Sequence, residues 1–395
     1  MNLHRILLRS VIIPVFLLFP ALCPVGEAVS VGGYNKIFLT GPLLSGSSQE
    51  SVMSLSNRFR IKFEAGDPGP VSFGAAYSIT PLISDSSIVS SRAQPYNYRI
   101  SDINSPFAGN SKDFAVYQNL DRLFVKYKAG AADVYFGRQA VAWGSAKAVN
   151  PTDVFIPFRF DELDKEERTG VDALRIRYTS GAMSELDAGC VFGRDMLPSE
   201  NSFFARDKMY ICGVDVTAML ADFRKNLLVG ADLAGSIGGA GAWIEAAYAV
   251  PRYFDDCARD PADEYLRFTT GCDYSFGGRF YGYAEYHFNG AGAEKTEDYS
   301  SVLLKTAYTE GAAYLTGRHY IMPGFVYQFT PLVNLGMLNI INMTDGSVLA
   351  APNLEYNFHE NFYFSLGAFE GFGGETLSEF GEYSGIYFSS VRYYF

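Results

Sequence analysis

The chain contains few of the residues that build metal centres, disulfide frameworks or nucleic-acid surfaces. Among its 395 residues are only 5 Cys, 4 His and 2 Trp. No Cys-X-X-Cys pair occurs, so neither a zinc site nor a redox motif is indicated. Without Cys-X-X-Cys-His the chain cannot hold c-type haem covalently. The formal net charge of −11 provides no basic field for phosphates, which argues against nucleic acid as a partner. We therefore predict no metal and no cofactor.

Long apolar runs are also missing. After residue 28 no segment approaches the roughly 20 apolar residues that a transmembrane helix requires. Mean hydropathy is only +0.02. Charged residues make up 19% of the chain, below the usual quarter, whereas Tyr, Phe and Trp make up 15% and there are 39 Gly. This composition excludes a helical membrane protein and favours β-strands that are apolar on one side.

The first 28 residues have the features of a secretory leader. A short basic start contains Arg5 and Arg9, an apolar core runs from Val11 to Leu22, and small residues at 26–28 suit cleavage. The alternative is a lipoprotein signal ending at Cys23, although the residues around it match such a signal poorly. We predict a signal peptide at 1–28 and one mature domain at 29–395.

The last segment, 384–395, alternates in polarity. One face carries aromatic and branched residues without charge, and the other places an arginine among hydroxyl groups. The first face comprises Tyr387, Ser389, Val391, Tyr393 and Phe395, and the second comprises Phe388, Ser390, Arg392 and Tyr394. Such a strand suits a wall with lipid on one side and an aqueous lumen on the other. The alternative is an edge strand of a soluble β-sandwich.

This aromatic C-terminus resembles the closing strand of bacterial outer-membrane β-barrels. In that family the final Phe is also an assembly signal. The resemblance therefore implies that the barrel assembly machinery recognises Phe395. It also implies contact with outer-membrane lipid and lipopolysaccharide, and a location in the outer membrane of a Gram-negative bacterium.

The mature chain is a series of alternating segments separated by turns. We identify seventeen of them, at 29–40, 52–65, 70–80, 114–129, 132–144, 171–180, 184–194, 207–219, 226–237, 241–250, 264–276, 279–290, 314–330, 332–343, 347–359, 361–372 and 384–395. Tight turns such as 66–69 and 277–278 contrast with long polar connections such as 81–113 and 145–170. Short turns on one rim and long loops on the other are typical of transmembrane barrels.

An odd number of strands conflicts with the even number found in closed bacterial barrels. Successive strands must alternate in direction, outward then inward. Directions assigned forward from the N-terminus disagree with those assigned backward from the C-terminus between residues 195 and 240. One missed strand there gives eighteen, and one segment outside the wall gives sixteen. We predict an all-β, antiparallel, up-and-down transmembrane barrel of 16–18 strands, and we prefer eighteen.

The cost of placing charge in lipid orients the strands. In 57–64, Arg58, Arg60 and Lys62 alternate with apolar residues. A basic residue facing lipid costs about 2–4 kcal/mol at midplane, so three would approach the stability of a typical domain. The charges are therefore expected to face the lumen. The same reasoning predicts a basic pore-lining wall of Arg58, Arg60, Lys62, Arg122, Lys126, Lys128, Arg138, Arg175 and Arg177.

The second half of the chain carries acidic residues at the corresponding phase. They predict an acidic pore-lining wall of Asp215, Asp232, Glu245, Asp273, Glu285 and Glu355. Since sequential strands are neighbours in a barrel, a basic sector would face an acidic sector across the lumen. That field would favour small polar or zwitterionic solutes and would let ions of either sign pass. The alternative is that these charges form ion pairs within the wall.

The third long connection, 145–170, is expected to fold into the barrel. It combines the apolar run 154–156 with a dense acidic stretch, and an outward loop would expose that apolar run as an adhesive patch. An inward loop would bury the run and set the acids against the basic wall. The predicted constriction residues are Asp153, Arg159, Asp161, Glu162, Asp164, Glu166 and Glu167. The alternative is an external cap or a short rim helix.

A further motif spans this region: Gly137-Arg138-Gln139, then Trp143-Gly144, then Asn150-Pro151-Thr152-Asp153. It resembles a broad group of porin-like barrels, and the inward third loop is similar to that of general porins. Some members of the group are the barrel partners of multihaem cytochromes in electron conduits. The resemblance thus implies a channel, or a sheath around such cytochromes.

We predict a non-enzymatic, porin-like channel for small polar solutes or ions, with the cytochrome sheath as the alternative. The position of the loop discriminates the two, because a haem-filled lumen leaves little room for it. Catalysis would need a rim Ser–His pair, and the mature chain has only His287, His319 and His359. A homo-oligomer is open, because no flat apolar interface is recognisable.

Overall fold

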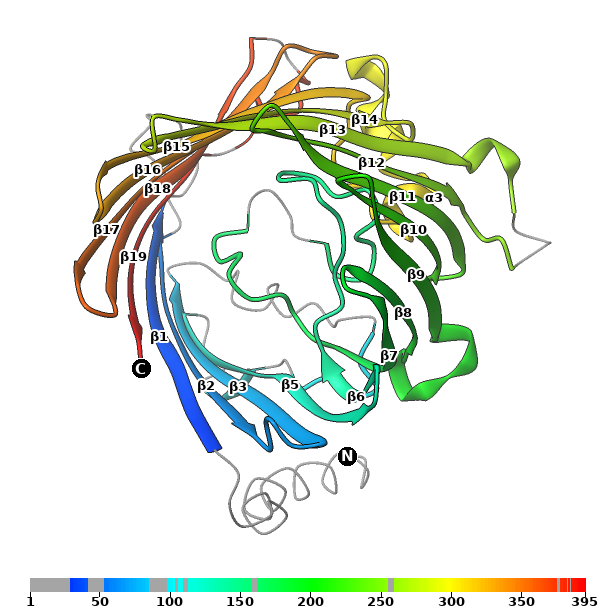
Figure 1. Ribbon diagram of the computed structural model, residues 1–395. Coiled ribbons are helices and arrows are strands. Elements are labelled where there is room, and N and C mark those ends of the chain that lie inside the picture. Colours follow the sequence, from blue (N-terminus) through cyan, green and yellow to red (C-terminus); the bar gives the residue numbers. More distant parts are fainter. Residues whose placement is uncertain are drawn as a thin grey trace.

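The strands join into one closed antiparallel sheet. The computed structural model describes residues 29–41, 53–84, 98–103, 106–108, 113–157, 162–254, 259–374, 377–381, 383 and 385–395. Each wall strand pairs with the next along the chain, and β1 pairs with β19, which leaves no edge. Viewed down the barrel, the first and last strands lie side by side (Figure 1).

Eighteen strands form the wall, and the three-residue β4 pairs with Val116 and Tyr117 of β5, beyond the part of β5 that pairs with β6. Their bounds are β1 Val29–Gly41, β2 Ser54–Ala65, β3 Val71–Ser84, β4 Pro106–Ala108, β5 Phe114–Ala129, β6 Ala132–Gln139, β7 Val171–Gly181, β8 Ser184–Val191, β9 Ser202–Ile211, β10 Val214–Phe223, β11 Asn226–Ile237, β12 Ala240–Val250, β13 Tyr265–Phe276, β14 Phe280–Asn289, β15 His319–Thr330, β16 Val333–Asn342, β17 Val348–His359, β18 Phe362–Phe372 and β19 Ile386–Tyr394. The predicted barrel and the preferred count of eighteen are confirmed.

The missing strand lies where the two strand directions clashed. The single segment predicted at 207–219 consists of the end of β9 and the start of β10. Between them Cys212 and Gly213 both have positive φ, 51° and 87°, and Ile211 pairs directly with Val214. This is the geometry of a two-residue hairpin turn of the primed type. Cys rarely occupies such a turn, so the sequence offered only one glycine as a signal.

The C-terminus closes the seam between β1 and β19. The backbones of Gly33 and Phe395 exchange two hydrogen bonds, of 2.9 and 3.1 Å. The Phe395 ring stacks on Phe59 at 5.8 Å, and Tyr393 lies 4.4 Å from Phe362. Aromatic rings so placed suit the interfacial girdle of a membrane barrel.

The two rims differ as the sequence predicted. On one rim the connections are short, at 66–70, 130–131, 182–183, 212–213, 238–239, 277–279, 331–332 and 360–361. On the other rim most are long, notably 140–170, 251–264 and 290–318. The connection 224–225 between β10 and β11 is a two-residue exception on this rim.

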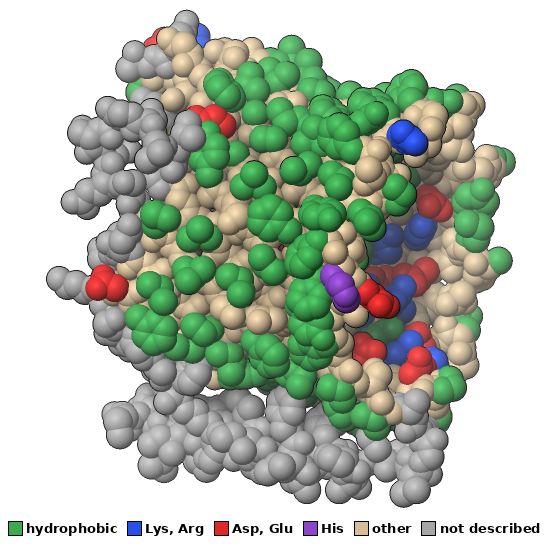
Figure 2. Space-filling model, turned by 90° about the vertical axis from the view of Figure 1, so that its left-hand side faces the viewer, with side chains coloured by type: hydrophobic (Ala, Val, Ile, Leu, Met, Phe, Trp, Pro, Cys, Tyr) green, Lys and Arg blue, Asp and Glu red, His purple; other side chains and the backbone are tan. Residues whose placement is uncertain are grey.

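The outer face of the wall is apolar. Along β2, Phe59 and Ile61 are 44% and 38% exposed, whereas Arg60 between them is 4% exposed. Figure 2 shows hydrophobic side chains over most of one outer face, and clusters of basic and acidic side chains in the hollow at its right-hand end. No helix in the described part of the chain is long and apolar enough to cross a membrane.

The buried core lies inside the barrel, where inward loops pack against the wall. The third long loop crosses the interior (Figure 1). Its Val154 and Phe155 are 1% and 2% exposed and pack against inward residues such as Phe204. A second cluster joins Val149 of this loop to Leu315 of the loop 290–318, which carries the short helices α2 (Tyr299–Val302) and α3 (Thr306–Thr309). The expectation of an inward loop is confirmed.

Candidate functional site

The third loop is bonded to opposite sectors of the barrel. Its first part, 145–152, contacts β11, β12 and β14, and its later part, 164–168, contacts β1, β2 and β5. Because each part of the loop is bonded to particular wall side chains, its course through the lumen is defined. The charged residues of the two sectors are described below in relation to it.

Glu245 on β12 anchors the start of the loop. It is fully buried, and its Oε1 accepts hydrogen bonds from the backbone N–H and the hydroxyl of Thr152, at 2.8 and 2.7 Å. Its Oε2 accepts from the backbone N–H of Ser145 at 3.1 Å and of Ala146 at 3.3 Å. Gly144, with φ +107°, fits closely here, because a Cβ would lie 2.6 Å from Oε2 of Glu245. The Trp-Gly and Asn-Pro-Thr-Asp motifs thus build this anchor.

Glu285 on β14 likewise accepts hydrogen bonds from backbone N–H groups of the loop, at the next two residues. It accepts backbone hydrogen bonds from Lys147 at 2.6 Å and Ala148 at 2.8 Å, and a third from the Trp243 indole at 2.9 Å. Asp232 on β11 accepts a 2.5 Å bond from the Ser145 hydroxyl. Three residues of the predicted acidic wall therefore hold backbone and hydroxyl donors of the loop.

Trp143 fixes the base of the loop through packing. Its ring centroid lies 4.8 Å from that of Phe204 and 5.5 Å from that of Phe155. Its indole N–H donates to Asp187 at 3.3 Å. Aromatic contacts of this kind supply buried apolar area together with a satisfied polar group.

The later part of the loop is held by ion pairs. Lys36 on β1 contacts Asp164 at 3.0 Å and Glu166 at 2.5 Å, and Arg58 on β2 contacts Asp164 at 2.9 Å. Lys62 on β2 pairs with Glu167. Burial acts to raise the pKa of Asp164, but Arg58 and Lys36 outweigh it and the pKa is lowered.

The same balance applies to Glu166. Burial would raise its pKa, but hydrogen bonds from Lys36 and Tyr394 lower it below the usual value. Both loop carboxylates are therefore stabilised in the charged form that the basic strands bind.

Arg60 and Arg122 surround Asp121. Arg60 contacts Asp121 at 2.7 Å and Glu167 at 3.6 Å, and Arg122 contacts Asp121 at 2.8 Å. A bulge in the pairing of β3 with β5, opposite Ala76 and Tyr77, brings the consecutive residues Asp121 and Arg122 into this cluster. Arg122 also donates to the backbone oxygen of Arg168.

The remaining residues of the predicted basic wall pair with acids of neighbouring strands or turns. The pairs are Lys126 with Asp133 at 2.7 Å, Lys128 with Asp67 at 3.2 Å, Arg138 with Asp172 at 2.7 Å, Arg175 with Asp187 at 2.6 Å, and Arg177 with Glu185. These contacts match the alternative of ion pairs within the wall.

Arg138 requires a correction, because it does not share an open lumen surface with the others. It follows Gly137, whose φ is +116°. It lies two residues from the exposed Phe136 on β6, and its register partner Asp172 lies two residues from the exposed Leu174 on β7. Arg138 is 7% exposed, and its guanidinium donates to Asp172 and to the backbone oxygens of Leu120 and Ser101. It thus closes the wall near the long-loop rim.

The other acidic residues are paired as well. Asp215 contacts Lys208 at 2.9 Å, Asp273 accepts a 2.7 Å bond from Tyr281, and Glu355 pairs with Arg392. The basic sector is compensated by ion pairs, whereas Asp232, Glu245 and Glu285 of the acidic sector are hydrogen-bonded mainly to neutral donors. Pairing of the basic side makes the transverse field predicted from the sequence weaker than the formal charges imply.

Among the predicted constriction residues, Asp153 is the most enclosed. It is 1% exposed and contacts Arg168 at 2.5 Å. Burial raises its pKa to about 7, although Arg168 acts in the opposite direction. Glu162 lies exposed at the lumen side of the loop, and Arg159 and Asp161 lie outside the described residues.

Three participants were missed by sequence reasoning. Lys36 is fully buried on the inward phase of β1, where the aromatic Tyr34 and Phe38 obscured the polar alternation. Asp121 enters through the bulge, which no local pattern announced. Arg267 donates to the backbone oxygen of Pro151 at 2.9 Å, and its phase with Asp273 could have revealed it.

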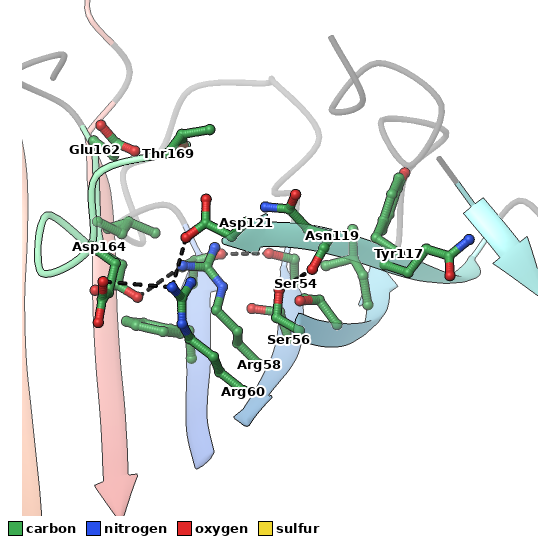
Figure 3. A pocket seen from close by; sticks show the side chains of 18 residues that line it. Ser54, Ser56, Arg58, Arg60, Tyr117, Asn119, Asp121, Glu162, Asp164 and Thr169 are labelled. Carbon is green, nitrogen blue, oxygen red and sulfur yellow. Dashed lines mark hydrogen bonds and ion pairs between the residues drawn. The ribbon is translucent and has the colours of Figure 1, made fainter. Parts of the chain in front are cut away.

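A cavity of 380 Å³ lies between the basic strands and the later part of the loop. It is lined by inward residues of β1, β2, β3 and β5 and by Glu162, Asp164, Glu167 and Thr169. Figure 3 shows Arg58 and Arg60 directed toward Asp164 and Asp121. A second cavity of 300 Å³ lies between the two parts of the loop, beside Trp143 and Tyr314.

The histidines have structural surroundings. His287 is 2% exposed and hydrogen-bonded to Thr269 at 2.8 Å, and His319 bonds to Tyr286 at 2.7 Å. His359 lies exposed near the short-turn rim. No group of metal-ligating side chains occurs within the described ranges.

No protein-family model matches the chain, and no curated protein matches it. Solved structures do. The chain is similar to Acinetobacter baumannii OccAB4, with a TM-score of 0.60 at 10% identity over 94% of this chain and 99% of that one. It is also similar to a BenF-like porin from Pseudomonas fluorescens Pf-5, with a TM-score of 0.58 at 12% identity over 94% and 98%. Pseudomonas aeruginosa OccK2 in complex with glucuronate gives a TM-score of 0.55 at 9% identity over 93% and 97%. The chain therefore has the fold of bacterial outer-membrane porins.

Proposed function

We propose that the chain is a passive channel of the Gram-negative outer membrane for small polar solutes or ions, narrowed by the loop 145–170. The observation that carries the proposal is the course of this loop through the lumen, bonded to Glu245 on one side and to Lys36 and Arg58 on the other. A loop in this position narrows the lumen and leaves part of its cross-section open.

The polar interior and the neighbours support the same conclusion. An apolar outer face with ion pairs inside suits a water-filled pore in lipid. The neighbours are porins, not enzymes, and one was solved with glucuronate bound. A sheath around a cytochrome would need the space that the loop occupies, so the inward loop weighs against that alternative.

Planar-bilayer recording tests the proposal. The purified chain should form stable single channels, and deletion of 154–166 should raise their conductance severalfold, because the described residues of this segment pack inside the barrel or pair with its inner wall. Circular dichroism should first establish that the shortened chain keeps its strand content.

Two results would reject it. The first is insertion of the full chain into the bilayer without any conductance, and co-purifying haem would then favour the sheath. The second is unchanged conductance after the deletion in a folded barrel, which would show that the loop does not restrict flow.

A further inference from the structure

We infer that the 380 Å³ cavity is a binding site for a neutral, polyhydroxylated solute of saccharide type. The inference rests on the proposed channel function and names the solute class that this part of the lumen selects. The cavity volume lies within the range of ligand pockets in general.

The charges around the cavity are already paired. Two cations, Arg58 and Arg60, and four carboxylates, Asp121, Glu162, Asp164 and Glu167, belong to its lining. From outside the lining, Lys36 pairs with Asp164, Lys62 with Glu167, and Arg99 and Arg122 with Asp121. A charged solute would have to displace one of these partners and leave the other unpaired, which is costly in a partly buried site.

Hydroxyl and amide groups form the opposite side. Thr40 and Ser54 pair across β1 and β2, and Ser78 pairs with Asn119 across β3 and β5. Ser56 on β2 and Thr80 on β3 lie in rows between these two, at the same alternation of each strand. Hydroxyl groups both donate and accept, so this surface can match a solute that carries several hydroxyls.

The site also has an apolar component and an unused donor. Phe38 and Tyr117 are part of the lining, and aromatic faces suit the C–H side of a sugar ring. Arg60 is 4% exposed, and in the described part of the chain its Nε–H has no hydrogen-bond acceptor. Arg60 lines the cavity (Figure 3), but this nitrogen is closed to solvent, so a solute hydroxyl accepts its bond only after the Arg60 side chain shifts toward the cavity.

Three probes with one ring size test the charge preference: glucose, glucuronate and glucosamine. In planar bilayers the half-blocking concentration of glucose should be at least about fivefold lower than those of the two charged sugars. Equal block by all three, or stronger block by either charged sugar, would overturn the inference.

A pair of variants tests the location. Ser56→Ala combined with Thr80→Val removes two hydroxyls with little change in shape, and should weaken glucose block about tenfold while KCl conductance stays within about twofold. Thr217→Val is the matched control, because Thr217 lies on β10 outside this cavity. Unchanged block in the double variant would overturn the site. An unaltered chain that conducts no ions would instead reject the channel function itself.

Discussion

The two attachments of the third loop use different chemistry. At the first, the buried Glu245 and Glu285 accept hydrogen bonds mainly from neutral backbone N–H groups. At the second, Lys36, Arg58 and Lys62 bind carboxylates of which Glu166 is 37% exposed. One attachment is dry and depends on backbone shape, and the other is ionic and reaches solvent.

This difference determines how each half responds to conditions. Buried hydrogen bonds to a carboxylate are little affected by salt, because the solvent has no access to them. Ion pairs that reach solvent are screened by salt, and in the second attachment Arg58 and Lys62 are 40% and 38% exposed although Lys36 is buried. We therefore expect the first half of the loop to stay attached to the wall when salt or pH changes. The second half is the part that high salt or low pH can release.

The largest expected effect comes from Glu245→Gln. The substituted amide brings its own N–H donors against those of Ser145, Ala146 and Thr152, and each orphaned buried donor costs about 1–3 kcal/mol. The first attachment should fail, so the thermal unfolding midpoint should fall and single-channel conductance should rise. Thermal melts and bilayer recordings measure both effects.

Glu355→Gln is the matched control for that experiment. Glu355 is also an inward wall carboxylate, but it pairs with Arg392 and has no contact with the described part of the loop. The single-channel conductance of the Glu355→Gln variant should equal that of the unaltered chain. If Glu245→Gln and Glu355→Gln changed the conductance equally, Glu245 would have no special role in anchoring the loop.

A smaller effect is expected from neutralising Arg58, Arg60 and Lys62 together to glutamine. Asp121, Asp164 and Glu167 would lose these partners, so the lumen would become more negative and selectivity should shift toward cations. The reversal potential in a salt gradient measures this shift. Lys225→Gln removes a charge at the turn between β10 and β11 and should leave the potential unchanged.

An unchanged reversal potential in the triple variant would contradict the role assigned to the ionic attachment. Loss of selectivity together with a large rise in conductance would show that the second half of the loop had also detached. The comparison with Glu245→Gln then separates detachment at one end from detachment at the other.

The sequence predicted the architecture well, because lipid imposes a strict period-two pattern. Arg60 between Phe59 and Ile61 was sufficient to orient β2. The β9–β10 hairpin was missed because a Cys-Gly turn resembles a strand interior. The bulge at Asp121 was missed because a bulge depends on the partner strand as well as on local residues.

The site was predicted less completely, since side-chain partners in a barrel come from distant positions. The sequence identified the acids of the loop and the bases of β2 separately. It could not show that Glu245 and Glu285 would accept backbone hydrogen bonds of the loop. Those contacts depend on the path of the loop, to which packing of Trp143 against Phe155 contributes, and that packing has no signal in the charge pattern.

The smallest expected effect is a response to acid at the ionic attachment. The pKa of Asp164 lies below its usual 3.8 and that of Glu166 below its usual 4.5. A lowered pKa means that the folded state gains stability from the charged form above these values, and loses it as pH falls through the lowered pKa. Between pH 7 and pH 5 both carboxylates stay charged, so the ionic attachment should hold. Below pH 3.8 the conductance should begin to rise and fluctuate as the second half of the loop is released. A chain with Asp164→Asn and Glu166→Gln should show the released behaviour already at pH 7 and lose this response below pH 3.8. If instead the double variant still responded below pH 3.8 as the unaltered chain does, the acid sensitivity would belong to other groups, and the ionic half of the loop would be as fixed as the buried half.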